Sequence, residues 1–312
     1  MSDKVDKTIS FIIVNFNMAD EIEKCINSIY KTNNDVSFEI IVVDNNSPDK
    51  KLQELEKRNF WSDVYYFYLE ENAGFGKGCN YGFTKAAGRY ICFLNPDTIL
   101  LEPIVLQIID LFKKDQSIGI IGPRQQIRKK IFDFSAGYYP NPFFEIFNLF
   151  YLGTFLEALI VYVYTKIKKK EYYQLNWILG AAIFIKSEVF KQVGGFDKDF
   201  FMFFEEVDLC RRVSLKGFKI IYYPHLKINH IGSVSGKRDY YLFTKRIYTS
   251  KFLYISKHYN VINKLLMNSL LSAQLFSQTF LWIFLFPFNV QKSKQKIRGF
   301  INLIKNLKNI IK

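Results

Sequence analysis

Short apolar runs alternate with amphipathic stretches along the N-terminal third of the chain. Continuous apolar runs predict strands at residues 8–14, 38–43 and 64–69, and a fourth strand that begins at Tyr90 and ends at Asp97. Between these runs, apolar positions recur three or four residues apart, which predicts helices. Strands that alternate with helices at this spacing indicate a mostly parallel, Rossmann-like α/β sheet with flanking helices, whose strand carboxyl ends share one edge.

Polar residues stand where the predicted strands end. Asn15 follows the first strand, Asp44 the second, and Asn95-Pro96-Asp97 the fourth. Ligands of open α/β sheets bind at this edge, so Asp97 is the most informative residue of the chain. Asn-Pro-Asp is also favourable turn chemistry, and a plain turn is the alternative.

A glycine-rich segment, residues 72–78, follows the third strand. It is not a phosphate-binding P-loop, because Gly78 stands where that motif has Ser or Thr, and it is not a dinucleotide fingerprint, because Cys79 replaces a glycine. We expect its glycines to let the backbone approach a ligand or turn tightly into a helix at about 79–87.

A second acidic cluster, Glu205-Glu206-Val207-Asp208, follows an aromatic run. If a helix begins near Glu205, then Glu205 and Asp208 share one face and Asp208 pairs with Arg211 or Arg212. Glu206 then points elsewhere. The alternative is a solvated acidic helix start, which the helix dipole favours.

Charge and composition limit the function. The 312-residue chain is 49% hydrophobic and 23% charged, as in an ordered protein, and its net charge is +14. Nearly all of this charge follows Asp239, where twelve Lys and Arg and no Asp or Glu occur. No nucleic-acid motif accompanies it, which disfavours nucleic-acid binding. Four cysteines without metal-type spacing and an N-terminus without a signal-peptide core indicate reduced thiols and a cytosolic catalytic domain.

Three apolar stretches are candidates for membrane contact. Residues 141–165 are aromatic-rich but interrupted by Glu145 and Glu157, which predicts an interfacial or partly buried helical pair. Residues 265–291 are uncharged and predict a shallow insertion or a spanning helix. The last turns form a basic amphipathic helix suited to an anionic membrane, with packing on the domain or in a dimer as the alternative.

The ordered series of motifs resembles the family 2 glycosyltransferases of the GT-A fold, and within them the rhamnosyltransferase-like enzymes of bacterial surface polysaccharides. The series comprises the strand ends, the Asn-x-Gly-Phe-Gly loop, Gly194-Gly195-Phe196-Asp197 and the Glu-Glu-x-Asp cluster. The resemblance covers about residues 8–258. It implies a catalytic domain at 1–258 with an apolar insertion at 141–170, and a membrane-associating helical region at 259–312.

The resemblance implies a nucleotide-sugar donor site at the sheet edge. Asp44 accepts a hydrogen bond from the pyrimidine N–H, and Asn72 and Gly74 line the ribose and diphosphate. The full set of implied donor-binding residues is Val14, Asn15, Asp44, Asn72, Gly74, Asn95, Asp97, Lys237 and Arg238. Lys237 and Arg238 are equally well explained as exposed loop charges.

A divalent metal site is also implied. Asn95 stands where the family's Asp-x-Asp element has its first carboxylate, so Asp97 is the principal protein ligand expected for Mg²⁺ or Mn²⁺. The donor phosphates and water complete such a shell. His230 falls at the position of a further metal ligand, and a structural histidine is the alternative.

For catalysis, the resemblance makes Glu206 the base that takes the proton from the acceptor hydroxyl. Gly194 to Asp197 form a bend that brings the helix to the crevice. The implied acceptor-binding residues are Trp177, Asp197, Glu205 and Asp208. A core role is an equal alternative for Trp177.

The expected reaction is inverting transfer of rhamnose from dTDP-rhamnose to a glycan on a polyprenyl diphosphate lipid, at the cytoplasmic face of the cell membrane. Alternatives are a UDP-hexose or UDP-galactofuranose donor, transfer to polyprenyl phosphate, and a catalytically inactive membrane-surface scaffold. The sequence leaves open whether the protein is a monomer or a homodimer.

Overall fold

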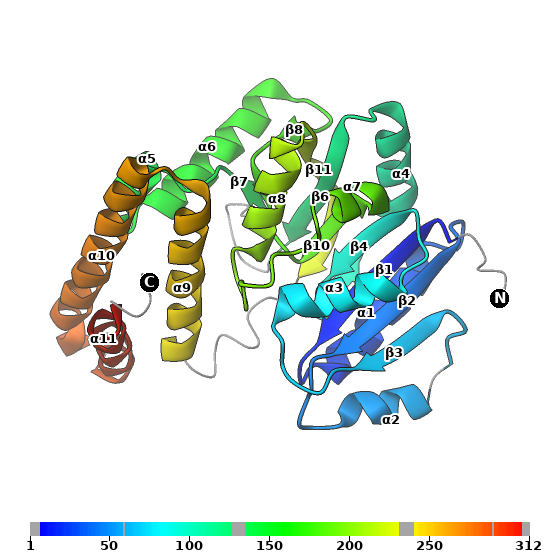
Figure 1. The fold of residues 1–312 in the computed structure, drawn as a ribbon, viewed down its shortest axis with the longest axis horizontal. Coiled ribbons are helices and arrows are strands. Elements are labelled where there is room, and N and C mark those ends of the chain that lie inside the picture. The colour runs from blue at the N-terminus through cyan, green and yellow to red at the C-terminus, as the bar shows by residue number, and fades with distance from the viewer. Residues whose placement is uncertain (1–6, 59, 127–134, 231–239, 289, 308–312) are drawn as a thin grey trace. The chain divides into compact units, whose positions relative to one another are not determined.

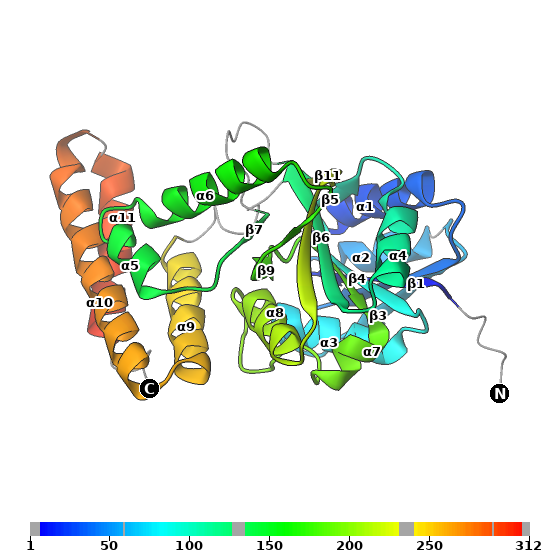
Figure 2. The same cartoon turned by 90° about the horizontal axis from the view of Figure 1, so that it is seen from above.

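The structure is a computed structural model that describes residues 7–58, 60–126, 135–230, 240–288 and 290–307. The chain folds into two units (Figures 1 and 2). The α/β unit contains the described residues of Met1–Gly137, Thr165–Phe201 and Glu205–Gly232. The helical unit contains those of Tyr138–Tyr164, Met202–Phe204 and Ser233–Lys312.

The α/β unit is built on one large sheet. Its strands are β1 (Ile9–Asn15), β2 (Phe38–Asp44), β3 (Val64–Tyr68), β4 (Tyr90–Leu94), β5 (Thr98–Leu100), β6 (Ile118–Gln126), β8 (Tyr173–Gln174), β10 (Ala182–Lys186) and β11 (Lys219–His230). A small second sheet pairs β7 (Ala136–Gly137) with β9 (Trp177–Ile178). The helices are α1 (Ala19–Thr32), α2 (Lys51–Lys57), α3 (Phe75–Lys85), α4 (Ile104–Lys114), α7 (Ser187–Gln192) and α8 (Glu205–Leu215).

The predicted parallel core of the sheet is confirmed. Strands run in the order β3-β2-β1-β4-β10-β6-β11-β5, and the first four are parallel. Asn15 is in register with Asp44, so these two strand ends lie side by side. Beyond β4 the sheet is mixed, because β10 is antiparallel to β4 and β6, and β5 is antiparallel to β11.

Helices cover both faces of the sheet because the strands are apolar on both. Apolar side chains of α1, α2 and α4 pack with Phe11, Ile40 and Cys92 in one buried cluster. On the opposite face, the Phe93 ring packs in a tilted arrangement against Phe190 of α7, with ring centroids 4.8 Å apart. This three-layer arrangement is the one expected for buried parallel strands.

Helix α3 begins at Phe75, earlier than the predicted start near residue 79. The glycines that suggested a loop instead allow close packing of the helix on the sheet. A Cβ added at Gly78 would lie 2.9 Å from Val14 Cγ1 in β1. Gly74, just before the helix, has φ 87°, and a Cβ there would lie 2.2 Å from the Phe201 carbonyl oxygen. Its backbone conformation and its surroundings therefore both require glycine.

The helical unit draws its elements from two distant parts of the chain. They are α5 (Pro142–Asn148), α6 (Gly153–Lys168) up to Tyr164, α9 (Tyr240–His258), α10 (Val261–Phe284), the 3₁₀ helix η1 (Phe286–Phe288) and α11 (Val290–Lys305). The buried cluster of this unit contains Tyr248, Phe252, Ile255, Met267, Leu271, Leu275, Phe300 and Leu303. The predicted pair of helices in the aromatic-rich stretch corresponds to α5 and α6.

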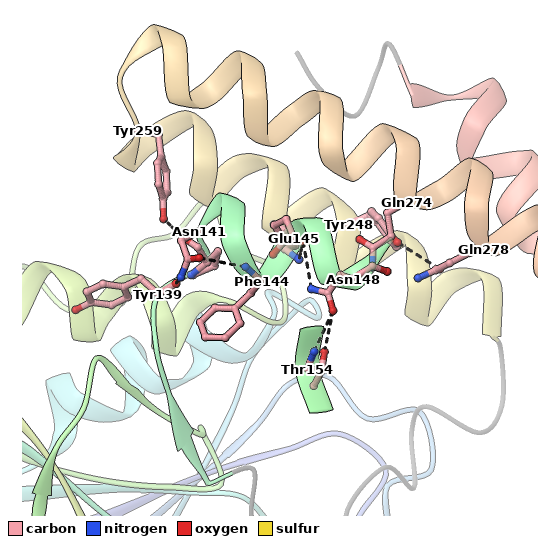
Figure 3. A network of polar contacts seen from close by, with 12 residues as sticks. Tyr139, Asn141, Phe144, Glu145, Asn148, Thr154, Tyr248, Tyr259, Gln274 and Gln278 are labelled. Atoms are coloured by element: carbon pink, nitrogen blue, oxygen red, sulfur yellow. Dashed lines mark hydrogen bonds and ion pairs between the residues drawn. The ribbon is translucent and has the colours of Figure 1, made fainter. Parts of the chain in front are cut away.

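Polar contacts tie α5 to the later helices (Figure 3). Lys251 of α9 forms an ion pair of 2.7 Å with the buried Glu145 carboxylate. The Asn141 side chain caps α5 by accepting from the Phe144 N–H at 3.2 Å. The Gln274 side chain of α10 donates to the Asn148 carbonyl at 3.4 Å. Glu145, which interrupts the apolar stretch in the sequence, is therefore an internal anchor of this unit.

Across the described residues, no helix is long and apolar enough to cross a membrane. Part of the apolar face of α11 is used within the protein, since Phe300 is buried and Ile304 packs against the cluster of α9 and α10. For Phe300 and Ile304, the structure therefore agrees with the alternative to membrane contact, a helix that packs on the domain. Helix α10, in contrast, exposes apolar side chains on one face while it buries others on the opposite face.

Candidate active site

The ends of β1 and β2 hold a fixed carboxylate. Asn15 Nδ2 donates to Asp44 Oδ1 at 2.6 Å, and the Ser47 hydroxyl donates to the same oxygen at 2.7 Å. The Ser47 N–H donates to Asp44 Oδ2 at 2.8 Å. Two lone pairs of Oδ1 and one of Oδ2 are thus used, and Oδ2 retains one acceptor position. Sequence reasoning found Asn15 and Asp44 but gave no role to Ser47, although it lies in the turn after β2.

Asn45 connects the glycine-rich segment to this edge. Its Nδ2 donates to the Gly74 carbonyl at 3.1 Å, and its Oδ1 accepts from the Ala73 N–H at 3.0 Å. Asn72 Oδ1 accepts from the Gly74 N–H at 3.1 Å and tightens the turn before α3. The predicted residues Asn72 and Gly74 therefore lie beside the carboxyl end of β2. Sequence reasoning missed Asn45, and its signal was the Asp-Asn-Asn turn.

His230 and Asp97 meet because β11 runs antiparallel to β5. In this pairing His230 is in register with Thr98, the residue after Asp97. His230 Nε2 lies 3.2 Å from Asp97 Oδ1, and the two side chains are 12% and 7% exposed. Asn95 Nδ2 lies 3.5 Å from the same nitrogen. The structure thus brings together Asn95, Asp97 and His230, as expected from the sequence.

Gln125 of β6 sets the orientation of the His230 ring. Gln125 Nε2 donates to the Leu179 carbonyl at 3.1 Å, which turns Oε1 toward His230 Nδ1 at 3.1 Å. With Nδ1 directed at the Gln125 oxygen, Nε2 is directed at the Asp97 carboxylate and the Asn95 amide. An imidazole nitrogen and a carboxylate oxygen directed at one position suit a cation held by both. Sequence reasoning missed Gln125.

The donor set fits a divalent cation that completes its shell from a ligand. Within the described ranges, no cluster of three or more His, Cys, Asp or Glu side chains is arranged to hold a metal. Asp97 and His230 together provide one carboxylate and one imidazole, which suits Mn²⁺ or Mg²⁺ when phosphate and water oxygens supply the other ligands. Burial, and secondarily the nearby Asp97, raise the pKa of the Cys25 thiol.

Helix α8 begins at Glu205, as predicted. Arg212 pairs with Asp208 at 2.7 Å, and the Asp208 side chain is 1% exposed. Arg212 Nη1 also donates to the Val193 carbonyl at 2.8 Å. The predicted pairing of Asp208 with an arginine is confirmed, and this contact ties α8 to the bend that precedes it.

Glu206 lies over the turn that precedes β10. A Cβ added at Gly180 would lie 3.7 Å from Glu206 Cβ and 3.8 Å from its Cδ. The next residue, Ala181, uses its carbonyl to accept from the Asn95 N–H at 3.0 Å and from the Thr98 hydroxyl at 3.3 Å. Within this turn, Gly180 is therefore close to Glu206, and Ala181 is hydrogen-bonded to Asn95 and Thr98, the residues that flank Pro96-Asp97. Both acidic segments thus lie next to the same turn.

Glu205 is the buried neighbour of Glu206. Its side chain faces α3, where a Cβ added at Gly76 would lie 3.8 Å from Glu205 Cβ. None of the described residues forms a hydrogen bond with its Oε2. Burial, reinforced by the charge of Glu206, raises the pKa of Glu205 well above its ordinary range. Burial between the two helices therefore disfavours the ionised form of Glu205.

The predicted bend before α8 is present. Gly194 and Gly195 have φ 80° and 76°, and Asn80 of α3 binds the next residue twice. Its Oδ1 accepts from the Phe196 N–H and its Nδ2 donates to the Phe196 carbonyl, both at 2.8 Å. Asp197 accepts from the Asp199 N–H at 2.9 Å.

Two further groups of predicted site residues remain. Trp177 is half-buried in β9, where it pairs with Gly137. Lys237 and Arg238 lie outside the described residues.

The protein has the GT-A fold of glycosyltransferases. Its structure is similar to GalNAc-T7 with UDP, GalNAc and Mn²⁺, with a TM-score of 0.65 and 15% identity over 87% of this chain and 52% of that chain. The mannosyltransferase PcManGT from Pyrobaculum calidifontis, in complex with GDP-Man and Mn²⁺, gives a TM-score of 0.58 and 14% identity over 97% and 88%. The chain belongs to glycosyl transferase family 2, whose family model matches residues 10–175.

Curated relatives agree with this family. The chain is 28% identical over 153 residues to rhamnosyltransferase WbbL of Escherichia coli K12, covering 47% of this chain and 54% of WbbL. It is 24% identical over 218 residues to poly-beta-1,6-N-acetyl-D-glucosamine synthase of Staphylococcus aureus MSSA476, covering 69% and 48%. The chain thus spans about half the length of the curated relatives it matches. The predicted family and its rhamnosyltransferase-like relation are confirmed.

Proposed function

We propose that the protein is an inverting glycosyltransferase that moves a sugar from a pyrimidine nucleotide-sugar onto a lipid-linked glycan in bacterial surface polysaccharide synthesis. The observation that carries the proposal is that the Gly180–Ala181 turn lies next to Glu206 and is also bonded to Asn95 and Thr98, the residues that flank Pro96-Asp97. A transferase of this class needs a diphosphate site and a base within reach of one anomeric carbon. Rhamnose from dTDP-rhamnose is the favoured donor, supported by the similarity to WbbL.

The donor base is proposed to bind at Asp44. Its Oδ2 retains one lone pair directed away from Asn15 and Ser47. Thymine and uracil carry an N3–H donor that suits this acceptor, whereas cytosine has an acceptor at N3. The proposal therefore includes dTDP- and UDP-sugars and excludes CDP- and CMP-sugars. The diphosphate is proposed to follow the turn at Asn72 and Gly74 toward Asp97.

Asp97 and His230 are proposed to hold Mg²⁺ or Mn²⁺. Such an ion neutralises charge on the departing nucleoside diphosphate. Gln125 keeps the His230 lone pair turned toward the shared position, and Asn95 adds an amide beside it. The substitution of Asn for the family's first aspartate leaves fewer negative charges at this edge of the sheet.

Glu206 is proposed to take the proton from the acceptor hydroxyl. The hydroxyl oxygen forms a bond to the anomeric carbon as the bond from that carbon to the phosphate oxygen breaks on the opposite face, which inverts the configuration. Burial disfavours ionisation of Glu205, which supports Glu206 as the basic carboxylate of the pair. Trp177, Asp197, Glu205 and Asp208 are the candidates on the acceptor side, with Asp208 acting through Arg212 to fix α8.

A UDP-hexose is the second candidate donor. The match to poly-beta-1,6-N-acetyl-D-glucosamine synthase extends over 69% of this chain, farther than the match to WbbL. Both donors satisfy the same contact at Asp44, so the base alone does not distinguish them. The choice between a dTDP-rhamnose and a UDP-hexose donor therefore depends on the residues that contact the sugar.

The helical unit is proposed to bind the anionic surface of the membrane, at the cytoplasmic face where a polyprenyl-linked acceptor is reached. Phe276, Phe280 and Phe284 recur every four residues on α10 and are 55%, 73% and 68% exposed. The opposite face of α10, with Met267, Leu271 and Leu275, is buried. Helix α10 therefore has two apolar faces, and its own unit buries only one of them.

Exposed cations on α11 support the same partner. Lys294, Arg298 and Lys305 lie on one side of the helix at spacings of four and seven residues. Each cation near an anionic membrane contributes about 1 kcal/mol to binding. Apolar side chains and cations on consecutive helices are the combination expected for peripheral binding to anionic lipid.

The function is tested by nucleotide release from a panel of dTDP-, UDP- and GDP-sugars with a lipid-linked acceptor. The wild type should release nucleotide from a pyrimidine donor only, and Glu206→Gln should lower kcat by about 10²–10⁴-fold without weakening donor binding. Glu188→Gln, the same change at the exposed start of α7, is the matched control. Undiminished transfer by Glu206→Gln would remove Glu206 as the base, and absence of donor binding would favour the inactive scaffold.

A further inference from the structure

Two lysines of α11 gather at one tryptophan of α10. The Lys292 ammonium lies 5.6 Å from the centroid of the Trp282 ring, and the Lys296 ammonium lies 5.1 Å from it. Residues four apart on a helix are neighbours, so the two lysines project from the same side of α11. Lys294 and Arg298, which are proposed to face anionic lipid, lie on another side of this helix.

A tyrosine of α9 completes this group of side chains. The Lys296 ammonium lies 3.6 Å from the centroid of the Tyr240 ring. That ring packs edge-on against Phe300, with centroids 5.8 Å apart, and a Cβ added at Gly299 would lie 3.4 Å from its Cδ1. The ring is therefore held in place by α11. The group, hereafter the lysine–aromatic cluster, lies within the helical unit and comprises Tyr240, Trp282, Lys292 and Lys296.

The lysine–aromatic cluster concentrates positive charge. Burial, and secondarily the charge of Lys292, lower the pKa of Lys296 to about 8. Within the described ranges, no carboxylate forms an ion pair with Lys296, and the chain has no Asp or Glu after Asp239, so α9, α10 and α11 contain none. Aromatic faces attract an ammonium group but carry no net charge. The cluster is therefore suited to an anion from outside the chain.

The connection from α10 to α11 adds exposed apolar surface. It joins the two helices that carry Trp282 and the lysines, and the side chains of Phe284, Phe286, Phe288 and Val290 along it are exposed. Cations next to exposed apolar side chains suit an amphiphile, whose charged group is joined directly to a hydrocarbon chain.

We propose that the lysine–aromatic cluster binds the diphosphate group of a lipid, whose hydrocarbon chain lies against the exposed apolar residues of the α10–α11 connection. Two ammonium groups one helical turn apart match an anion with at least two negative charges, as a diphosphate has. A phosphodiester headgroup such as that of phosphatidylglycerol carries only one. The proposal rests on the proposed function for the identity of this lipid as the carrier of the glycan acceptor.

The first test compares vesicles that contain farnesyl diphosphate with vesicles that contain phosphatidylglycerol at equal surface charge. The wild type should bind the diphosphate vesicles on the order of ten-fold more tightly, because both lysines form charge-assisted hydrogen bonds with one anion. Replacing Lys292 and Lys296 by methionine should abolish this preference while the aliphatic side chains remain packed. Equal affinity of the wild type for both vesicles, or an unchanged preference in the variant, would overturn the proposal.

Replacing Lys294 and Arg298 by methionine is the matched control, because it removes two charges from another side of the same helix. This control should weaken binding to both kinds of vesicle alike and keep the preference for the diphosphate. If it loses the preference as the first variant does, total charge sets the preference and the proposal is wrong.

A direct measurement on the wild type does not depend on how the variants fold. Fluorotryptophan labelling gives one fluorine NMR signal for each of the three tryptophans, and Trp282→Phe identifies the signal of Trp282. Farnesyl diphosphate should shift this signal and leave that of Trp61, in the α/β unit, in place. An unmoved Trp282 signal would overturn the proposal.

Free pyrophosphate distinguishes a lipid from a soluble anion. It has no hydrocarbon chain, so half-saturation of the Trp282 shift should require at least about ten-fold more pyrophosphate than farnesyl diphosphate. Equal half-saturation would overturn the assignment to a lipid. These measurements need no sugar donor. If the wild type transfers no sugar, the proposed function fails, whereas the Trp282 shift and the vesicle preference still decide whether the diphosphate site exists.

Discussion

His230 Nε2 lies 3.2 Å from Asp97 Oδ1, although Asp97 lies in the turn before β5 and His230 ends β11, far along the chain. The antiparallel pairing of β5 with β11 brings them together, because it places His230 opposite Thr98. The same pairing explains why a three-residue strand follows Asp97 directly. The segment Asn95-Pro96-Asp97 therefore forms a turn and also borders a candidate metal site.

Replacing Gln125 by leucine should weaken metal binding. Without the acceptor for Nδ1–H, the His230 ring is no longer held with its Nε2 lone pair toward Asp97. Loss of such an outer contact lowers metal affinity by about 10–100-fold. Titration calorimetry with Mn²⁺ in the presence of the nucleoside diphosphate measures this, and EDTA should abolish donor turnover in the wild type. Unchanged Mn²⁺ affinity in Gln125→Leu would contradict the assigned ring orientation.

Replacing Glu205 by glutamine should change how stability depends on pH. The unfolded chain ionises this group near its ordinary pKa of 4.5, whereas burial and Glu206 raise the pKa in the folded state. The folded state then binds more protons above pH 4.5, so the free energy of unfolding falls as pH rises through this window. Each unit of pKa difference corresponds to about 1.4 kcal/mol. The Tm advantage of Glu205→Gln should therefore be larger at pH 8 than at pH 5.

Glu188→Gln is again the control for this measurement, because its carboxylate is exposed at the start of α7. It should show no comparable growth of the Tm difference with pH. A Glu205→Gln advantage that is constant between pH 5 and pH 8 would mean that Glu205 ionises normally in the folded protein.

Replacing Asp44 by asparagine should disrupt both the fold of the edge and donor binding. Asp44 accepts from Asn15 Nδ2, the Ser47 hydroxyl and the Ser47 N–H. An asparagine must present its NH₂ group to one of these donors, which leaves a buried donor unpaired and lowers stability by about 1–3 kcal/mol. Chemical denaturation measures this loss, and equilibrium binding of UDP and dTDP should weaken in parallel. Affinities for UDP and dTDP that are unchanged from the wild type would exclude Asp44 from base recognition.

Anionic vesicles should bind the wild type through α10 and α11. Replacing Lys294, Arg298 and Lys305 by alanine removes about 3 kcal/mol, or roughly 100-fold in affinity, at low ionic strength. Phe280→Ser should weaken binding to anionic vesicles further because it removes exposed apolar area. Cosedimentation with phosphatidylserine vesicles measures both effects.

Leu106→Ser provides the matched control for the vesicle measurement, because Leu106 is an exposed apolar residue of α4 in the α/β unit. It should bind vesicles as the wild type does. If neither the cation variant nor Phe280→Ser changes binding, the exposed face of α10 has another partner, and self-association by sedimentation velocity becomes the measurement that identifies a dimer.

The parts of the site that could be predicted are those encoded by local sequence. Asn15 and Asp44 each end an apolar strand, and parallel strands bring such ends together by geometry alone. The start of α8 and the Asp208–Arg212 pair follow from helical spacing. The family resemblance then indicated that these strand ends and the start of α8 belong to one site.

The parts that could not be predicted depend on pairing between distant segments. Gln125 stands within a strand that carries no signal of a site, and only the register of β6 with β11 brings it to His230. The start of α3 was misplaced because glycines usually break helices, whereas here Gly78 is required by contact with Val14. In the sequence, Glu145 only interrupts an apolar stretch, because its ion-pair partner, Lys251, lies far along the chain.

The helical unit also has a consequence for synthesis. Glu145 and Lys251 are 106 positions apart, so at about 5–20 residues per second the ribosome needs roughly 5–20 s to deliver the second partner after the first. During that interval α5 emerges without the helices that cover it. A nascent chain can therefore form strands β1 to β4 of its sheet well before Lys251 is available to pair with Glu145.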